Sequence, residues 1–543
     1  MPEQNLKEYD FIIIGAGSAG AVLANRLSAS DQHQVLLLEA GGTDRRLFVQ
    51  MPIGYGKTYY DERVNWKYHT QPVAALNNKP SYWPRGKVLG GSSSINAMVY
   101  VRGHPQDYND WATTAPGWSW ADVAPIFKRM EAWDGEQHPD RGTDGPLSVH
   151  STHNQAHPLC DHFFAASQQL QIPFNTDYNV NDMEGAALFQ ITTKDGWRGS
   201  TSRCYLRPAL KRNNLTLETH AHVKRLITNG NRAEKIEYQQ RGKSVTVKAR
   251  CEIILCAGAV NSPQLLELSG IGDPDRLKSL GIQPTHSLPH VGENLSDHLG
   301  ADIVCRSRLP SLNQELRPLI GKIKSGLQFI FGRKGPLSLS VNQAGGFIRS
   351  QPGSDRPDLQ LYFSPLSYTR APVGTRPLVN PDPFPGFLLG FNPCKPTSTG
   401  NTHIRSDNPF EAPSIQPNYL TTEHDRHLML EGMRLMRRYT STEAMQQLVE
   451  EEIYPGVNIQ SNDELTRFIA DNAWTVFHPC GTCRMGTGPT DSVVDPSLNV
   501  HGMQGLRVAD ASVFPSIPTG NTNGPAIMVG EKASELILQD YPA

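Results

Sequence analysis

Residues 9–42 of the chain read YDFIIIGAGSAGAVLANRLSASDQHQVLLLEAGG. The apolar runs at residues 11–14 and 35–38 predict two buried strands, and residues 21–27 between them predict a helix. Three glycines, spaced as GxGxxG, separate the first strand from the helix. In this order of strand, glycine turn, helix and strand, the spacing predicts a site for an adenine dinucleotide.

Three glycines and one acidic residue in this stretch each have a mechanical reason. Gly15 permits the tight turn, Gly17 lets the backbone approach a pyrophosphate, and Gly20 allows the helix to pack closely on the strand. The phosphates are expected at the helix N-terminus, where free N–H groups and the helix dipole favour negative charge. Glu39 ends the second strand, about 20 residues after the last glycine, where it suits a ribose hydroxyl. This pattern leaves NAD and FAD open.

Length, charge and cysteine use limit the classes of function. A chain of 543 residues is too long for one compact core, so two or more lobes are expected. Its 51 Lys and Arg residues nearly balance 53 Asp and Glu residues, which implies no nucleic-acid partner and favours an enzyme acting on a small molecule. The polar start MPEQNLKEYD is not typical of a signal peptide, and no apolar run approaches the length of a membrane span. The eight scattered cysteines are expected to be reduced thiols of a cytoplasmic protein.

A second glycine-rich stretch, residues 85–96, reads RGKVLGGSSSIN. Its bare backbone can lie against a flat or phosphorylated ligand, and Asn96 can form a hydrogen bond with that ligand. A flexible linker is the alternative interpretation. The apolar side chains of Val88, Leu89 and Ile95 argue against it, because flexible linkers lack such anchors.

Two long motifs resemble one flavoprotein family. Residues 86–96, continuing to Tyr100 and Gly103, resemble the first signature of the glucose-methanol-choline (GMC) oxidoreductases, and residues 258–272, GAVNSPQLLELSGIG, resemble the second. The resemblance implies FAD, bound by a discontinuous Rossmann-like domain at residues 1–155, 200–302 and 475–543. It places an α+β substrate-binding domain, built on an antiparallel sheet, at residues 156–199 and 303–474. The expected fold class is therefore α/β.

Several local predictions concern the middle of the chain. Residues 200–208 are expected to open a helix, and residues 251–256 predict a continuous apolar strand that ends at the cofactor. Residues 319–332, LIGKIKSGLQFIFG, predict an amphipathic and weakly basic helix. A membrane-surface or substrate-entrance role is one interpretation, because some dehydrogenases of this family are membrane-bound and reduce quinone. A helix that covers the core is the preferred expectation. The short strands of a small antiparallel sheet are expected at residues 215–218, 223–227, 235–238 and 245–249.

The candidate base lies in residues 474–486, WTVFHPCGTCRMG. A lone histidine is usually structural, but this stretch resembles the family's HPxGTCRMG motif, which implies that His478 is the catalytic base. Cys480 and Cys483 have the spacing of a redox or zinc pair, but no second ligand pair accompanies them, so no metal is predicted.

The C-terminal segment, like residues 9–42, predicts a strand, a glycine-containing loop and a helix in that order. Residues 505–512 predict a strand, residues 518–525 a glycine- and asparagine-rich loop, and a helix follows to Leu538. Pro525 suits the first turn of that helix, whose positive end would face an anion. By resemblance this end points at the pyrimidine edge of the flavin. Asn521 matches the family's second catalytic position, where some relatives carry a histidine.

These residues predict oxidation of a primary alcohol to the aldehyde. A histidine titrates near neutral pH and can take the hydroxyl proton while the carbinol hydrogen leaves as hydride to flavin N5. Asn521 would hydrogen-bond the substrate oxygen. By resemblance, contacts with FAD are expected from Gly15, Gly17, Ser18, Ala19, Gly20, Glu39, Ala40, Trp66, Arg85, Val88, Gly91, Ser92, Asn96, Ala97, Met98, Val99, Val223, Ala257, Gly258, Ser262, Trp474, Asp510, Ala511, Asn521, Thr522 and Pro525.

Two departures from family patterns qualify this prediction. Relatives with covalent flavin carry a histidine where this chain has Ile95, so dissociable FAD is expected. Residues 394–400, CKPTSTG, resemble the cysteine segment of the family's fatty-acid photodecarboxylases. A lyase of the same fold, including the hydroxynitrile lyases, is therefore the alternative function, although the photodecarboxylases lack a histidine at the position of His478.

The substrate and the electron acceptor stay open at this level. Residues 92–103 most resemble bacterial choline and medium-chain alcohol dehydrogenases. Choline would need an aromatic or carboxylate cage, for which Tyr362, Phe363 and Trp474 are candidates. The acceptor is expected to be oxygen or a quinone or dye, and a peripheral contact with the inner face of the membrane is left open.

Overall fold

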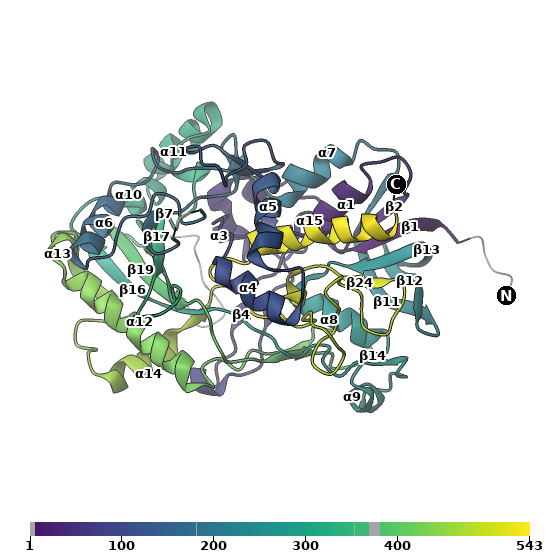
Figure 1. The fold of residues 1–543 in the computed structure, drawn as a ribbon. Coiled ribbons are helices and arrows are strands. Elements are labelled where there is room, and N and C mark those ends of the chain that lie inside the picture. Colours follow the sequence, from purple (N-terminus) through teal and green to yellow (C-terminus); the bar gives the residue numbers. More distant parts are fainter. Residues whose placement is uncertain (1–5, 181, 352, 369–380, 543) are drawn as a thin grey trace.

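The computed structural model describes residues 6–180, 182–351, 353–368 and 381–542. Figure 1 shows two lobes side by side, each built on its own sheet. The lobe at the right of the view contains both the first and the last strands of the chain, and the lobe at the left contains a sheet built from strands that lie between them in the sequence. The division into domains at the predicted residue boundaries stays a prediction.

The first sheet has the strand order β10-β2-β1-β13-β12-β11, and β24 also pairs with β13. Parallel pairing places Ile12 of β1 between Leu36 of β2 and Ile253 of β13. These strands are continuous apolar runs because both faces of the sheet are covered. The strands are β1 (Glu8–Ile14), β2 (Val35–Glu39), β10 (Leu215–Thr219), β11 (Ala221–Asn229), β12 (Arg232–Gln240), β13 (Lys243–Leu255) and β24 (Leu506–Val508).

The expected small antiparallel sheet needs two corrections. β11, β12 and the first half of β13 are antiparallel, but β10 pairs in parallel with β2 at the opposite edge of the first sheet. Residues 245–249 and 251–256 were expected as two strands, and 13 residues form the single strand β13. Arg250 is exposed within this strand, between the buried Ala249 and the buried residues 252–255, and its charge interrupts an apolar pattern that belongs to one element.

The second sheet has the order β22-β16-β19-β18-β17-β7, and β23 also pairs with β16. The pairs along this path are antiparallel. Helix α12 (Glu423–Ser441) packs on this sheet so closely that a Cβ atom at Gly432 would lie 2.0 Å from the ring of Phe391. The strands are β7 (Gly185–Leu188), β16 (Leu299–Ser307), β17 (Ala344–Ile348), β18 (Leu359–Ser364), β19 (Gly386–Pro393), β22 (Val449–Tyr454) and β23 (Trp474–Thr475).

Two helices from opposite ends of the chain lie side by side on the first sheet (Figure 1). They are α1 (Gly20–Leu27) and α15 (Asn523–Asp540), joined by an ion pair of 2.7 Å between Arg26 and Glu531. The expected helix at residues 200–208 begins as a π-helical turn, Ser202–Leu206. The other α-helices are α2 (Leu47–Gln50), α3 (Tyr55–Thr58), α4 (Pro105–Thr114), α5 (Trp120–Met130), α6 (Leu159–Gln169), α7 (Arg207–Ala209), α8 (Gly258–Leu268), α9 (Pro274–Ser279), α10 (Leu312–Leu316), α11 (Leu319–Gly332), α13 (Glu443–Leu448) and α14 (Asn462–Asn472).

Helix α11 contradicts the preferred expectation that it covers the core. Only Ser325 and Phe329 of this helix are buried, whereas its large aliphatic side chains face solvent. Its apolar stripe therefore points away from the molecule. None of the helices in the described part of the chain is both long and apolar enough to cross a bilayer.

Short two-stranded ladders complete the described structure. They are separate from the two seven-stranded sheets and extend neither of them. They are formed by β3 (Tyr68–His69) with β4 (Tyr82–Trp83), β5 (Glu131–Trp133) with β6 (Leu147–Val149), β8 (Thr193–Lys194) with β9 (Trp197–Arg198), β14 (Ile271–Gly272) with β15 (His286–Ser287), and β20 (Asn401–His403) with β21 (Ser414–Gln416).

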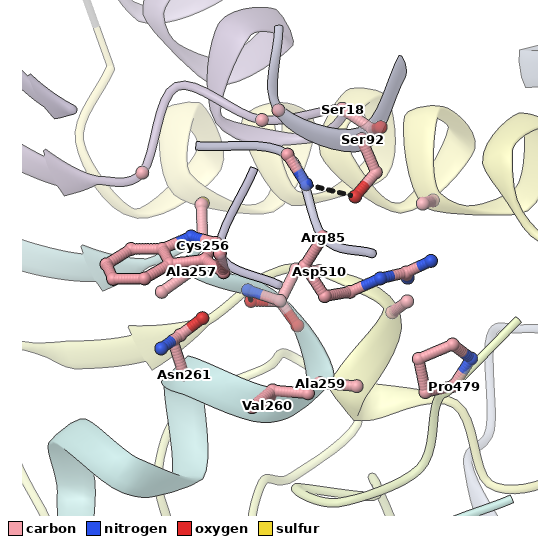
Figure 2. A pocket seen from close by; sticks show the side chains of 18 of the residues that line it. Ser18, Arg85, Ser92, Cys256, Ala257, Ala259, Val260, Asn261, Pro479 and Asp510 are labelled. Atoms are coloured by element: carbon pink, nitrogen blue, oxygen red, sulfur yellow. Dashed lines mark hydrogen bonds between the residues drawn. The ribbon is translucent and has the colours of Figure 1, made fainter. Parts of the chain in front are cut away.

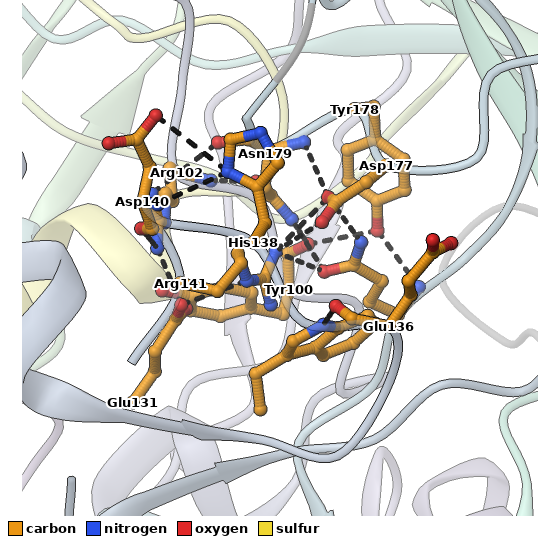
Figure 3. A network of polar contacts seen from close by, with 12 residues as sticks. Tyr100, Arg102, Glu131, Glu136, His138, Asp140, Arg141, Asp177, Tyr178 and Asn179 are labelled. Atoms are coloured by element: carbon orange, nitrogen blue, oxygen red, sulfur yellow. Dashed lines mark hydrogen bonds and ion pairs between the residues drawn. The ribbon is translucent and has the colours of Figure 1, made fainter. Parts of the chain in front are cut away.

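A buried ion cluster beside the first lobe holds the chain that leaves the second glycine-rich stretch (Figure 3). Arg102 and Arg141 both contact the carboxylate of Glu131, and Arg141 also pairs with Asp177 at 3.1 Å. The backbone N–H of Arg102 donates to Asn179 at 2.8 Å. Because buried charges are stable only when paired, this cluster fixes the course of residues 97–104.

Candidate active site

A pocket lies at the carboxyl ends of β1, β2 and β13 (Figure 2). The loop after β1 contributes Gly15 and Gly17, the end of β2 contributes Glu39, and Ala257 and Gly258 follow β13. Ligands of open α/β sheets bind in this position because the loops there diverge and leave a crevice. At its other end the pocket reaches His478 and Asn521, so it is lined by both ends of the chain.

The two glycine-rich stretches touch in the floor of this pocket. Gly15 has φ +103°, and a Cβ atom there would lie 2.5 Å from the carbonyl oxygen of Cys256. A Cβ atom at Gly91, where φ is +53°, would lie 2.7 Å from the Cα atom of Gly17. Only bare backbone permits this approach, which leaves main-chain groups facing the pocket.

Glu39 is held by the turn that it closes. One carboxylate oxygen accepts a hydrogen bond from the Ala16 N–H at 3.0 Å, and the other accepts from the Gly41 N–H at 2.8 Å. Burial raises the pKa of this carboxyl to about 7, although both N–H groups oppose the shift. The side chain can therefore accept further hydrogen bonds from ligand hydroxyls when it is ionised.

Asp510 links two segments at the wall of the pocket. Its Oδ2 accepts from the Gly258 N–H at 2.8 Å and from the Ser262 hydroxyl at 2.6 Å, and its Oδ1 accepts from the Ser512 N–H at 2.7 Å. These bonds join the start of α8 to the loop after β24. The carboxylate is thereby fully engaged by the protein.

A chain of hydrogen bonds runs through the buried histidines at the far end of the pocket. The Nε2 atom of His298 lies 2.8 Å from the carbonyl oxygen of Cys394, its Nδ1 lies 3.0 Å from Nδ1 of His478, and Nε2 of His478 lies 3.1 Å from the amide nitrogen of Asn521. A carbonyl can only accept, so His298 carries its hydrogen on Nε2. Its Nδ1 then accepts from Nδ1–H of His478, which leaves a lone pair on Nε2 of His478.

Burial keeps both histidines neutral. It lowers the pKa of His298 to about 4 and holds the pKa of His478 well below its usual range, where His298 and the guanidinium of Arg85 add to the effect. The amide of Asn521 is oriented from its other side, because its oxygen accepts from Gln360 at 3.1 Å. At neutral pH the arrangement therefore presents an unprotonated imidazole nitrogen beside a fixed amide donor.

The backbone around His478 is also held from behind. Asp297 accepts from the His478 N–H at 2.7 Å and from the Thr475 hydroxyl at 2.6 Å, and Tyr419 donates to the same carboxylate. Phe477 has φ +70°, which a non-glycine residue rarely adopts. The surrounding hydrogen bonds hold this strained turn, and the turn presents the imidazole to the pocket.

Comparison with models of known protein families shows to which family the chain belongs. A family model described as "GMC oxidoreductase" matches residues 9–300, and a second model with the same description matches residues 396–530. Together the two models cover well over half of the 543 residues. The chain belongs to the GMC oxidoreductase family. GMC oxidoreductases depend on FAD and act on CH–OH donors, so FAD is the cofactor of this chain.

Full-length relatives of this GMC oxidoreductase support the same assignment. It is 41% identical to an alcohol dehydrogenase [acceptor] of Pseudomonas putida, with 98% of this chain and 96% of the relative covered. It is also 41% identical to an oxygen-dependent choline dehydrogenase of Photobacterium profundum, with 98% and 94% covered. The crystal structure of pyridoxine 4-oxidase from Mesorbium loti superposes with a TM-score of 0.87 at 29% identity, covering 97% and 98% of the two chains.

The predicted contact residues divide into those that line the pocket and those behind it. Five predicted residues lie behind the lining. Gly20 begins α1, Val88 packs in a small apolar cluster, Ser262 bonds to Asp510, Trp474 is in β23, and Pro525 lies inside α15. The predicted residues in the lining are Gly15, Gly17, Ser18, Ala19, Glu39, Ala40, Trp66, Arg85, Gly91, Ser92, Asn96, Ala97, Met98, Val99, Val223, Ala257, Gly258, His478, Asp510, Ala511, Asn521 and Thr522.

These residues fit FAD. The glycine approach at Gly17 and Gly91 leaves backbone for a pyrophosphate, and Glu39 stands at one end where an adenosine ribose would lie. His478 and Asn521 stand at the other end, where the reactive ring would lie. Which of the residues contact the cofactor stays a prediction.

Sequence reasoning missed His298 and Asp297. Both lie in residues 293–299, ENLSDHL, and their partner His478 is about 180 residues later in the chain. No periodicity or spacing connects segments so far apart. The only available signal was the presence of two ionisable side chains in a loop that leads directly into a buried strand.

The cysteines singled out by the sequence are all buried. Cys480 and Cys483 are buried free thiols, and no group of metal ligands occurs among the described residues. Cys394 contributes its carbonyl oxygen to His298, while burial raises the pKa of its thiol well above the usual range. The names of the relatives describe alcohol and choline dehydrogenases and do not favour the lyase alternative.

Proposed function

We propose that this GMC oxidoreductase oxidises an uncharged primary alcohol to the aldehyde, with His478 as the base. The observation that carries the proposal is the hydrogen-bond chain from the Cys394 carbonyl through His298 to His478, which leaves Nε2 of His478 unprotonated. An alcohol hydroxyl is a poor proton donor at neutral pH, so its oxidation needs such a base.

The residues at this end of the pocket have distinct roles in the proposal. Nε2 of His478 takes the hydroxyl proton, and the amide of Asn521 donates to the substrate oxygen and fixes its position. His298 is a positioning residue, because it keeps the hydrogen of His478 on Nδ1 and accepts a hydrogen bond from the imidazolium that forms. FAD, when bound, supplies the acceptor for the carbinol hydrogen.

The charges of the pocket favour an uncharged substrate over choline. Among its described lining residues, the only carboxylates are Glu39 and Asp510. Glu39 lies at the ribose end, and Asp510 is fully engaged by the protein. The only Lys or Arg side chain in that lining is Arg85, whose charge disfavours a quaternary ammonium group nearby.

The candidate aromatic cage for choline does not assemble. Tyr362 and Phe363 are neighbours on β18 and therefore point to opposite faces of the sheet. Tyr362 donates to Asn392 at 2.7 Å, whereas Phe363 stacks on Phe163 in a different apolar cluster. Trp474 lies on a different strand, β23. These three side chains cannot surround one ammonium group.

A matched pair of alcohols tests the substrate class. Choline and 3,3-dimethylbutan-1-ol have the same shape, but only choline is charged. We expect anaerobic flavin reduction by the neutral alcohol to have a second-order rate constant higher by about 10-fold or more, because choline loses hydration without gaining a paired carboxylate. Stopped-flow absorbance measures both constants. A higher constant for choline would exclude the uncharged-substrate assignment while leaving alcohol oxidation intact.

The buried Glu39 makes FAD affinity depend on pH in the proposed site. Ribose hydroxyls donate to the ionised carboxylate, and its pKa of about 7 means that the protonated form dominates at lower pH. We expect the Kd of FAD to rise as the pH falls through about 7, by up to about tenfold per pH unit. Glu39→Gln is expected to bind FAD weakly with no such slope. Fluorescence titration of apoprotein with FAD measures both, and an equal slope in the variant would contradict the role of Glu39.

The remaining proposals concern attachment, acceptor and location. We propose that FAD is not covalently bound, which is supported by Ile95 at the position where covalent relatives carry a histidine. The proposed acceptor is oxygen or a quinone or dye. The proposed location is the cytoplasm with a peripheral contact at the inner face of the membrane, a contact that the outward apolar face of α11 supports.

A further inference from the structure

Helix α11 carries the densest exposed apolar surface of the protein. Six of the fourteen large hydrophobic side chains that are exposed in the described residues lie on this one helix. Ile320 is 82% exposed and Phe331 is 83% exposed. Such a concentration marks an interaction surface, because exposed apolar residues of soluble proteins are normally scattered singly or in small patches. The six residues are Leu319, Ile320, Ile323, Leu327, Ile330 and Phe331.

The six side chains share one face of the helix. At 100° per residue, their positions fall within a third of the helical circumference, and the buried Ser325 and Phe329 lie on the opposite side. The ring of Phe329 packs against Trp197 at 5.0 Å between centroids, and the guanidinium of Arg333 covers the same indole at 4.5 Å. The helix is therefore anchored along its inner side, and its apolar face is left without a partner among the described residues. Figure 1 shows α11 projecting at the upper edge of its lobe.

The charges carried by α11 and by the chain on either side of it, from residue 316 to residue 354, have one sign. Arg317, Lys322, Lys324 and Lys334 are exposed on or beside α11 and Arg333 is half-buried, whereas no acidic residue occurs between Glu315 and Asp355. The whole chain has a formal net charge of −2, so this cationic stretch is a local feature. A helix with an apolar face bordered by lysines fits an anionic bilayer surface, where the apolar side chains enter the headgroup boundary and the cations meet lipid phosphates.

A second copy of the chain is a poorer occupant. Two α11 helices packed face to face would bring their lysines together without carboxylates from the helices to neutralise them. The charge complementarity therefore selects the lipid.

We propose that α11 lies in the surface of an anionic membrane, with its six apolar side chains buried below the phosphates. This inference specifies the element and the lipid charge of the proposed peripheral contact, and it does not rest on the proposed reaction. Leu319, Ile320, Ile323, Leu327, Ile330 and Phe331 enter the bilayer, and Lys322 and Lys324 stay at the level of the headgroups.

Vesicle flotation of the FAD-loaded enzyme tests the proposal. Vesicles of phosphatidylcholine mixed equally with phosphatidylglycerol are expected to carry the enzyme to the top of the gradient at low salt. Vesicles of phosphatidylcholine alone are expected to bind it more weakly by about 10-fold or more, because the basic residues lose their counter-charge. Recovery of all the enzyme at the bottom with the anionic vesicles would overturn the proposal.

Matched substitutions distinguish membrane binding through α11 from non-specific binding of the protein to vesicles. The double variant Ile320→Glu/Phe331→Glu is expected to lose binding to anionic vesicles by about 10-fold or more. Val457→Glu is the control, since Val457 is 63% exposed in the turn before α14. Both variants are expected to keep the flavin spectrum and alcohol-driven bleaching of the wild type. Equal vesicle binding by the double variant would overturn the proposal. A second result would also overturn the proposal. The wild-type enzyme would fail to bind vesicles, and light scattering would show that it forms dimers that the double substitution abolishes.

Discussion

Replacement of His478 by alanine is expected to slow flavin reduction by alcohol by about 10³-fold or more, while FAD stays bound. Alanine removes the nitrogen that takes the hydroxyl proton, and general base catalysis typically contributes about 10² to 10⁴ in rate. The two nearest polar side chains do not replace it. Asn521 is an amide with no basic nitrogen, and His298 lies on the far side of His478 with its lone pair directed at the missing ring.

Anaerobic stopped-flow absorbance measures this loss directly, and the flavin spectrum of the variant shows that FAD is retained. His162→Ala is a suitable control, because His162 lies on α6 and bonds to the Ala444 carbonyl. The control is expected to reduce its flavin at the wild-type rate. If His478→Ala did so as well, another group would have to be the base.

The second large effect is expected at His298, which does not touch the substrate. His298→Leu is expected to lower the rate constant of flavin reduction by about 10²-fold, because His478 then has no acceptor for its Nδ1–H and can place its hydrogen on Nε2 instead. His298→Asn places an amide oxygen near the former position of Nδ1. It is therefore expected to recover at least about tenfold of the loss.

The comparison of these two variants distinguishes positioning from simple packing. Leucine and asparagine are similar in size, so a role in filling the core predicts that asparagine, which buries an amide, is the more damaging of the two. The positioning role of His298 predicts the reverse order. Melting temperatures and FAD content of both variants control for folding, and a slower asparagine variant would contradict the positioning role.

Sequence reasoning succeeded where neighbouring residues determine the structure. One continuous unit contains the glycines at 15, 17 and 20, the strands that flank them and the acid at 39. The spacing of these residues is enough to predict its glycine turn. The family resemblance at residues 86–96 and 474–486 then joined distant pieces that no periodicity connects. Both stretches contribute to the pocket lining. Most of the predicted site residues, from these stretches and from others, lie in that lining.

It failed where tertiary context decides. The strand at residues 215–219 reads like its antiparallel neighbours, but it pairs with β2 because the chain crosses to the other edge of the sheet. Helix α11 has the amphipathic pattern of a core-facing helix, and hydrophobic periodicity cannot tell which side of a helix faces the protein. The role of His298 could not be predicted, because it depends on a carbonyl and an imidazole from two other segments of the chain.

The central claim is that the alcohol itself reduces the enzyme. The most direct measurement is the anaerobic visible spectrum of the purified wild-type protein during addition of a neutral primary alcohol, with the product identified. The predicted result is bleaching of the flavin with one aldehyde formed per flavin reduced. A bound flavin that stays oxidised with every primary alcohol tested, choline included, would contradict the claim.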